Sequence, residues 1–207
     1  MHARLFSNAG AGLCLFVAAL SILFGLTTLP SGFQFSGLQA EPAPVWGTVT
    51  PAAPPLPGPS GNVVRVSSVA ALQAAVQALS SNTTIVIAPG TYTLTSTLWV
   101  NGPLSNVTIR GESNRPDDAV LVGTGMGVPS GGVPHGIWSG NGVTGLTIAN
   151  LTIRDVWQHP IIFNPGTESP RVYNVRLVNA GEQFIKASTD GSGDGVGDGI
   201  VEYSIFA

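Results

Sequence analysis

Asn150-Leu151-Thr152-Ile153-Arg154-Asp155 recurs in near-copy on both sides of itself. The copies occupy residues 106–111, 174–179 and 202–207, and the central apolar residues of the four segments are Ile109, Ile153, Leu177 and Ile205. Separations of 44, 24 and 28 residues between these positions predict two turns of a coil in the first gap and one turn in each of the others. Repetition every 20 to 30 residues or so, with β-branched and polar residues alternating, is typical of a β-solenoid.

Alternation along a strand predicts which side chains face the core. We expect four pairs to stack inward: Val107 with Ile109, Leu151 with Ile153, Val175 with Leu177, and Tyr203 with Ile205. Asn106, Asn150 and Asn174 then fall at one position of the coil, where their amides can form a ladder. Asn82, Asn106 and Asn150 also satisfy the N-glycosylation pattern, which is the alternative interpretation of these residues.

The composition suits a β-rich protein with many loops. The 207 residues include 27 Gly and 16 Pro, only 9% of them are charged, and the formal net charge is −3. Basic residues form no cluster or stripe, so we do not expect a nucleic-acid partner.

Residues 1–29 carry an apolar run at 13–29, which predicts an export signal or, alternatively, an N-terminal membrane anchor. Cys14, the single cysteine, lies within this run, so we expect no disulfide in the exported part. Residues 30–61 are rich in proline and are predicted to be an extended linker. We therefore expect a secreted or cell-envelope protein, attached to a membrane only if residues 13–29 are retained.

Residues 62–207 are predicted to form one domain. Ser68 can cap a helix whose apolar stripe is Val69, Leu72, Val76 and Leu79, and such a helix can cover the open end of a solenoid. The final strand-like residues, 204–207, have no capping segment after them, from which we expect further coils beyond this sequence.

The order of these segments resembles a known family. The helical stripe is followed by Thr84-Ile85-Val86-Ile87-Ala88-Pro89-Gly90-Thr91-Tyr92 and then by the 106–111 repeat. This order resembles the N-terminal part of right-handed parallel β-helix proteins of the pectin-lyase-like superfamily. The resemblance implies an all-β, right-handed parallel β-helix with an N-terminal capping α-helix. Because the superfamily includes pectate and alginate lyases, polygalacturonases, epimerases and phage tailspikes, it does not settle an activity.

The resemblance also implies where catalysis would occur. Lyases of this superfamily use an outward Lys or Arg to remove the proton beside a uronate carboxylate, often with Ca²⁺. The candidate catalytic residues are Lys186, Arg176, His159 and Glu182, expected on neighbouring turns. The alternatives are that Lys186 is a solvated surface charge and that His159, which precedes Pro160, is a corner residue bonded to backbone.

Two tryptophans are candidates for substrate binding. Trp138 and Trp157 can stack on sugar rings or cover the apolar edge of a coil. Trp138 lies in a Gly-rich insertion, residues 123–142, which we expect to interrupt the coils as a loop.

A Gly/Asp-rich segment near the end resembles part of a calcium loop. Asp190, Ser192, Asp194 and Asp198 occupy positions 1, 3, 5 and 9 of such a loop, with Gly195 at position 6, and Glu202 lies one residue after position 12. The alternative is a Gly/Asp turn that binds no ion.

These observations predict an exported, monomeric β-helix that acts on or binds an acidic extracellular polysaccharide. Lyase or hydrolase chemistry is one hypothesis, and a non-catalytic adhesion or glycan-binding module is the other. On the predicted rungs we identify neither the paired Asp-Asp motif of the polygalacturonases nor the arginine and calcium set of the pectate lyases.

Overall fold

The computed structural model describes residues 52–129 and 132–207. The chain divides into two units, residues 1–47 and 48–207, and only the second contains described residues. The predicted signal or anchor (1–29) and most of the predicted linker (30–61) lie outside them. Among the described residues, no helix is long and apolar enough to cross a membrane.

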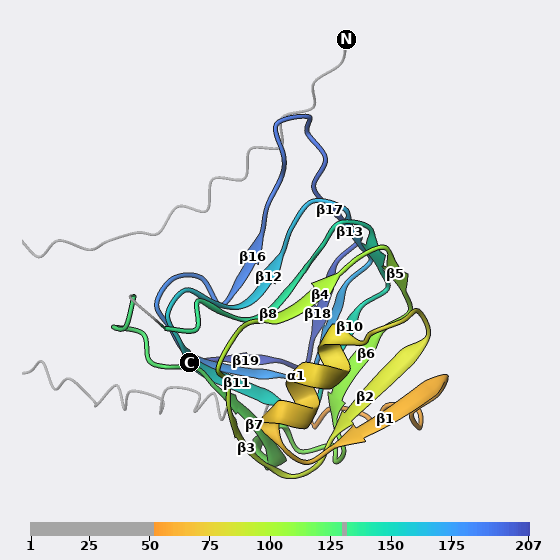
Figure 1. Ribbon diagram of the computed structural model, residues 1–207, viewed down its shortest axis with the longest axis vertical. Helices are drawn as coiled ribbons and strands as arrows, with labels where there is room; N and C mark the ends of the chain where they lie inside the picture. Colours follow the sequence, from red (N-terminus) through yellow and green to blue (C-terminus); the bar gives the residue numbers. More distant parts are fainter. Residues whose placement is uncertain (1–51, 130–131) are drawn as a thin grey trace, which may run out of the picture. The chain divides into compact units, whose positions relative to one another are not determined.

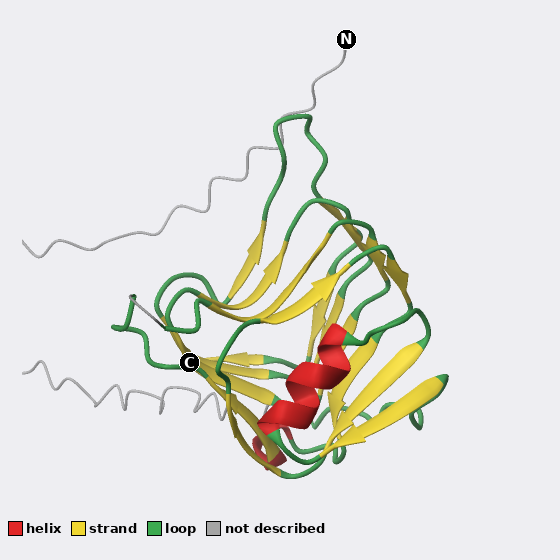
Figure 2. Ribbon diagram, in the orientation of Figure 1, coloured by secondary structure: helices red, strands yellow, loops and turns green. Residues whose placement is uncertain are grey.

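Strands dominate the described part of the chain and form four sheets, A to D (Figures 1 and 2). Sheet A contains β1 (Asn62–Val66), β2 (Thr83–Ile87), β6 (Thr108–Gly111), β10 (Thr147–Ala149), β14 (Arg171–Tyr173) and β18 (Ile200–Glu202). Sheet B contains β3 (Gly90–Thr93), β7 (Ala119–Val122), β11 (Thr152–Val156), β15 (Arg176–Ala180) and β19 (Ile205–Phe206). Sheet C contains β4 (Leu98–Asn101), β8 (His135–Gly140), β12 (His159–Phe163) and β16 (Ile185–Ala187). Sheet D contains β5 (Leu104–Ser105), β9 (Val143–Thr144), β13 (Thr167–Glu168) and β17 (Val196–Gly197).

From β2 onward the chain visits the sheets in the fixed order A, B, C, D, and every strand pairs in parallel with its counterpart one coil away. Ile85 pairs with Ile109, and Ile148 with Val172, so the shortest coils contain 24 residues. Longer coils carry insertions at their corners. The fold is an all-β parallel β-helix, as the sequence predicts.

The core consists of columns of apolar side chains that run along the coil. Each sheet contributes one main column: Ile85, Ile109, Ile148 and Val172 from A; Tyr92, Leu121, Ile153 and Leu177 from B; Leu98, Ile137, Ile161 and Ile185 from C; Leu104, Val143, Thr167 and Val196 from D. Most of these side chains are fully buried, and each buried apolar side chain contributes about 1.5–3 kcal/mol to stability.

The predicted register between the first two repeats is wrong. Ile109 lies in sheet A and pairs with Ile148, whereas Ile153 lies in sheet B and pairs with Leu121 and Leu177. The expected inward position of Ile205 is also wrong, because Ile205 pairs with Arg176. The next residue, Phe206, pairs with Leu177 and continues the core column. The repeated motif therefore marks corners of the coil without saying which corner.

Two different corners contain asparagines in the left-handed conformation. Asn82 and Asn106 precede strands of sheet A with φ of 61° and 54°, and the Asn106 amide donates to Asn82 Oδ1 at 3.1 Å. Asn150 and Asn174 lie between sheets A and B with φ of 54° and 50°, and the Asn174 amide donates to Asn150 Oδ1 at 2.8 Å. The predicted ladder is thus two ladders, and Asn106 is not in the same one as Asn150. A short polar side chain suits such corners because it tolerates positive φ.

The helix α1 (Val69–Gln77) covers the first coil, as expected. Ser68 caps it by accepting a hydrogen bond from the Ala71 backbone at 3.2 Å. Leu72 and Val76 are buried in the core, and Figure 1 shows the helix lying across the end of the coil near β2 and β4. The apolar interior at this end is therefore shielded from water.

The last residues of the predicted linker differ from an extended spacer. Residues 52–61 lie along the outer face of sheet A and are held there through their backbone carbonyls. Pro54 O accepts from the Tyr173 hydroxyl at 2.7 Å, Pro57 O accepts from Arg110 at 2.7 Å, and Ser60 O accepts from the Thr84 hydroxyl at 2.8 Å. We call residues 52–61 the strap.

Candidate functional site: an aromatic and basic column on sheet C

The outer face of sheet C presents a column of large side chains. Parallel pairing aligns Trp99 with Trp138, Trp138 with Ile162, and Ile162 with Lys186. These positions alternate with the inward column of Leu98, Ile137, Ile161 and Ile185, so they face away from the core. We call Trp99, Trp138, Ile162 and Lys186 the sheet C column.

The two tryptophans of the column touch. Their ring centroids lie 5.2 Å apart with the planes tilted by 53°, and Trp99 is 50% exposed. Gly140 provides the space for Trp138, because a Cβ at residue 140 would lie 2.6 Å from the edge of that indole. Trp138 is partly buried, so Trp99 and one part of Trp138 form an aromatic surface that can stack against planar or ring-shaped ligands.

Two histidines and a glutamate adjoin the column. His159 is buried beneath it, with Nδ1 3.1 Å from Gln183 O and Nε2 3.4 Å from the Glu182 carboxylate. The carboxylate of Glu182 is itself partly exposed and also accepts a hydrogen bond from the Gln158 amide at 3.1 Å. The structure thus brings Glu182, His159 and Lys186 to one side of the coil. The His159 ring contacts the Glu182 carboxylate and can hold it in place.

His135 lies in register with His159 and is held neutral. Burial is the main cause that lowers its pKa from 6.5 to about 4; the nearby His159 and Lys186 act in the same direction, and the Glu182 carboxylate acts in the opposite one. Its Nδ1 is buried and has no hydrogen-bond partner among the described residues. The neighbourhood of His135 therefore disfavours an additional positive charge inside the coil.

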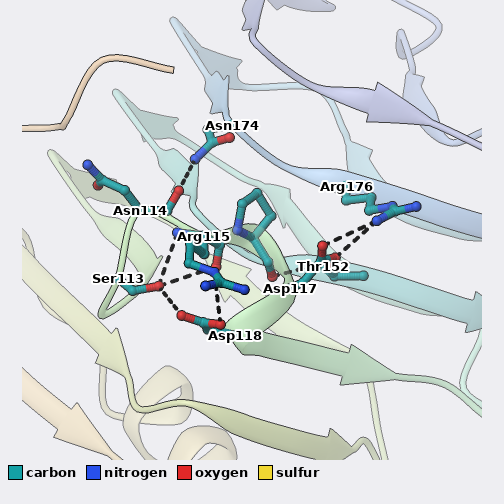
Figure 3. Close-up of polar contacts among 9 residues, drawn as sticks. Ser113, Asn114, Arg115, Asp117, Asp118, Thr152, Asn174 and Arg176 are labelled. Atoms are coloured by element: carbon teal, nitrogen blue, oxygen red, sulfur yellow. Dashed lines mark hydrogen bonds and ion pairs between the residues drawn. The ribbon is translucent and has the colours of Figure 1, made fainter. Parts of the chain in front are cut away.

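Arg176 lies elsewhere, on sheet B. Its guanidinium contacts the Asp117 carboxylate at 3.2 Å, and Thr152 donates to the same carboxylate at 3.3 Å (Figure 3). Because β15 belongs to sheet B and β16 to sheet C, the structure does not bring Arg176 into one groove with Lys186.

Figure 3 shows the insertion that holds Arg176. Residues 112–118, which include the short 3₁₀ helix η1 (Pro116–Asp118), form a loop at the corner between sheets A and B. The Asn174 amide donates to Asn114 O at 2.8 Å, and the Ser113 hydroxyl donates to Asp118 at 2.7 Å. The loop borders a cavity of about 390 Å³ that Tyr203 and Ile205 also line. The charged residues of its lining are Arg115 and the Arg176–Asp117 pair, and within the described residues the buried Nε of Arg176 has no hydrogen-bond partner.

The second predicted tryptophan is separate from the column. Trp157 follows β11 at the corner between sheets B and C, where its backbone NH donates to Val133 O at 3.3 Å. The predicted insertion is shorter than expected, because residues 135–140 form β8 and place Trp138 in a strand. Trp138 is thus part of the rigid coil.

The five predicted calcium ligands do not gather in this structure. Asp190 Oδ1 accepts hydrogen bonds from the backbone NH and the hydroxyl of Ser192 and from the Asp194 backbone, which lowers the pKa of Asp190. Asp198 lies at the corner before β18, and Glu202 pairs with Arg171 at 2.8 Å in sheet A. The described residues contain no group of three or more His, Cys, Asp or Glu side chains arranged to hold a metal ion. Calcium binding stays a prediction.

Sequence reasoning missed Trp99 and the His135–His159 pair. The signal was available in the local alternation, because Leu98-Trp99-Val100, Ile137-Trp138-Ser139 and Ile161-Ile162-Phe163 share one pattern. Aligning these three segments, instead of the asparagine repeats alone, would have defined sheet C.

A scan against protein-family models finds no match, and a search of curated proteins finds none. Among solved structures, the chain is similar to the PL6 family alginate lyase AlyGC, with a TM-score of 0.48 and 16% sequence identity. The similarity covers 74% of this chain and 21% of that chain, so this chain spans about a fifth of that lyase's length.

Proposed function

We propose that the chain is an exported protein of the pectin-lyase-like superfamily that binds an acidic extracellular polysaccharide along the sheet C column. The observation that carries the proposal is the alignment of the exposed Trp99 and the partly exposed Trp138 with the partly exposed Lys186 on the outer face of one sheet, with the buried Ile162 between Trp138 and Lys186.

The chemistry of the column fits a chain of acidic sugars. Aromatic faces pack against the apolar faces of sugar rings, and a lysine attracts a uronate carboxylate without demanding a fixed geometry. Strands of neighbouring coils lie about 4.8 Å apart, so the column offers contacts repeated at roughly the spacing of successive sugar units. A polymer would lie parallel to the axis of the coil and pass each residue of the column in turn.

Lyase activity is the second candidate, because Lys186 belongs to the column and the partly exposed Glu182 carboxylate lies on the same side of the coil. In such an elimination, Lys186 takes the proton next to the uronate carboxylate, and the electron pair forms a carbon–carbon double bond. The bond to the glycosidic oxygen breaks, and that oxygen takes a proton from the lysine or from water. Calcium near 190–202, if it binds, would neutralise a substrate carboxylate.

Binding is tested with the full chain on pectate, alginate and glycosaminoglycans, by retardation in gels that contain each polymer. We expect Trp99→Ala, Trp138→Ala and Lys186→Ala to weaken retardation about tenfold each. Met126→Ala and Arg154→Ala are matched controls, because they remove an exposed apolar side chain and an exposed cation away from the column. Equal retardation of all five variants and the unmodified chain would reject the column as the binding face.

The lyase candidate has its own assay, the absorbance of unsaturated uronate products with and without a calcium chelator. Lys186→Gln keeps a long polar side chain but has no basic nitrogen that can accept a proton. Retained binding with lost product formation in this variant would identify Lys186 as the base. Absence of product from the unmodified chain on every polymer would leave the binding function alone.

A further inference from the structure

A second polar site lies between the strap and the outer face of sheet A. A cavity of about 180 Å³ is lined by the strap residues Leu56, Pro57, Gly58, Pro59 and Ser60 and by the sheet residues Thr84, Thr108, Thr147, Arg110 and Arg171. The lining contains two arginines and three threonine hydroxyls but no carboxylate. A neighbouring cavity of about 300 Å³ shares the three threonines and continues along the sheet past Asn82 and Asn106.

Arg110 is the unusual residue of this site. Arg110 is only 7% exposed, and its guanidinium makes no ion pair with the described part of the chain. Its two hydrogen bonds go to backbone carbonyls, one at 2.7 Å to Pro57 O and one at 3.4 Å to Gly111 O. A buried guanidinium has five N–H donors, so these contacts leave capacity for a further acceptor. A buried charge without a counter-ion is costly, and an anion beside it removes that cost.

The other charged groups nearby are already paired. Arg171 contacts the Glu202 carboxylate through both Nε and Nη2 at 2.8 Å and lies over the Tyr173 ring at 4.4 Å. Glu202 is therefore committed to Arg171, and Arg110 keeps the uncompensated charge. Thr84 donates to Ser60 O, whereas the Thr108 and Thr147 hydroxyls have no such bond within the described residues.

We propose that this cavity binds a small carboxylate anion, with Arg110 as its charged donor and the hydroxyls of Thr108 and Thr147 as neutral donors. One N–H of Arg110 donates to the Pro57 carbonyl, so an oxygen acceptor fits beside the guanidinium. The fork of a guanidinium matches the two oxygens of a carboxylate. The carboxylate can come from a free organic acid or from a sugar acid. This site is on a different sheet from the column, so the inference does not rest on the proposed function.

The test uses the full chain and acetate as the probe, with chloride exchanged for acetate at constant ionic strength. A ligand that binds only the folded chain raises its melting temperature as its concentration increases. We expect acetate to raise it for the unmodified chain. We expect both Arg110→Gln and Thr108→Val to increase the dissociation constant for acetate. The increase should be about tenfold or more for Arg110→Gln, which loses the charged donor. Arg65→Gln is the matched control, because Arg65 aligns with Val86 and Arg110 on the same face but is exposed and absent from the lining.

Galacturonate, in place of acetate, distinguishes the two sources of the carboxylate. Stabilisation by acetate alone indicates a site for small free acids, whereas equal or stronger stabilisation by galacturonate indicates a sugar acid. Absence of stabilisation by both anions, or the same stabilisation in Arg110→Gln and Thr108→Val as in the unmodified chain, overturns the proposal. If Arg110→Gln does not fold, Thr108→Val, which changes one hydroxyl to a methyl, still decides the matter.

Discussion

The imidazole rings of His135 and His159 stack with their planes 4° apart and their centroids 5.3 Å apart. Burial is the main cost of charging His135, and a positive charge on His159 at this distance would add repulsion, so the pKa of His135 falls to about 4. In the unfolded chain the pKa of His135 returns to about 6.5. Between these two values the unfolded state binds more protons than the folded state, so stability increases with pH.

The first prediction follows from this difference. The contribution of His135 to stability is fully present above pH 6.5 and is lost as the pH falls towards 4, by about 2 kcal/mol. Urea unfolding at pH 7 and pH 4.5 measures the loss. His135→Gln cannot be protonated, so we expect a smaller loss in this variant than in the unmodified chain. An equal loss in both would assign the acid sensitivity to other groups.

The second prediction concerns the buried amide ladder. Asn150 accepts from Asn174 at 2.8 Å and donates to Asn114 at 3.1 Å, and it has a φ of 54°. Asn150→Ala removes both hydrogen bonds and strains the corner, so we expect a loss of about 3 kcal/mol. Asn150→Gly relieves the strain and should lose about 1 kcal/mol less.

Asn141 provides the control for that measurement. It has a similar φ of 60° but is exposed, and its amide bonds only to the exposed Asn101. Asn141→Ala is therefore expected to cost about 1 kcal/mol, mostly through backbone strain. If Asn141→Ala and Asn150→Ala were equally destabilising in urea unfolding, the ladder would contribute nothing beyond its backbone conformation.

The class of fold could be predicted from the sequence because the corners of the coil repeat a chemical requirement. Each asparagine corner needs positive φ and is followed by residues that alternate between core and surface. The same requirement applies at the D-to-A and A-to-B corners, which is why the 106–111 and 150–155 motifs look alike although they occupy different sheets. Insertions such as 112–118 lengthen single coils. The sequence therefore lacks the constant period that would have shown that the two motifs belong to different corners.

The candidate site could be predicted only in part. The 24-residue separation of Ile161 and Ile185 is one coil, so this spacing alone is enough to align Lys186 with Ile162, as the structure does. Arg176 was predicted on a turn next to that of Lys186. The chain turns a corner between the two residues, so Arg176 lies on sheet B and Lys186 on sheet C. Contacts that depend on the strap, such as that between Arg110 and Pro57, join residues 53 positions apart and leave no trace in a periodic pattern.

The third prediction tests the packing between coils. Gly111 ends β6, and a Cβ at this residue would lie 2.0 Å from Asn150 O of the next coil. Because the carbonyl belongs to a corner held by the ladder, it cannot move away cheaply, and Gly111→Ala should destabilise the fold by about 3 kcal/mol or more. Gly127→Ala is the control, since nothing lies within 4 Å of its Cβ position. Urea unfolding should show a change of no more than about 0.5 kcal/mol for Gly127→Ala.

The fourth prediction distinguishes Arg176 from Lys186, which the sequence analysis grouped as candidate catalytic residues. Arg176 and Asp117 form a partly exposed pair, with side chains 43% and 61% exposed, so Arg176→Ala should change stability by less than about 1 kcal/mol. Arg176 lies on sheet B, so we expect unchanged retardation of Arg176→Ala in polysaccharide gels, against a tenfold or so weakening for Lys186→Ala. If Arg176→Ala weakened binding as much as Lys186→Ala, the ligand would have to span the B-to-C corner, and the column would be only part of its binding surface.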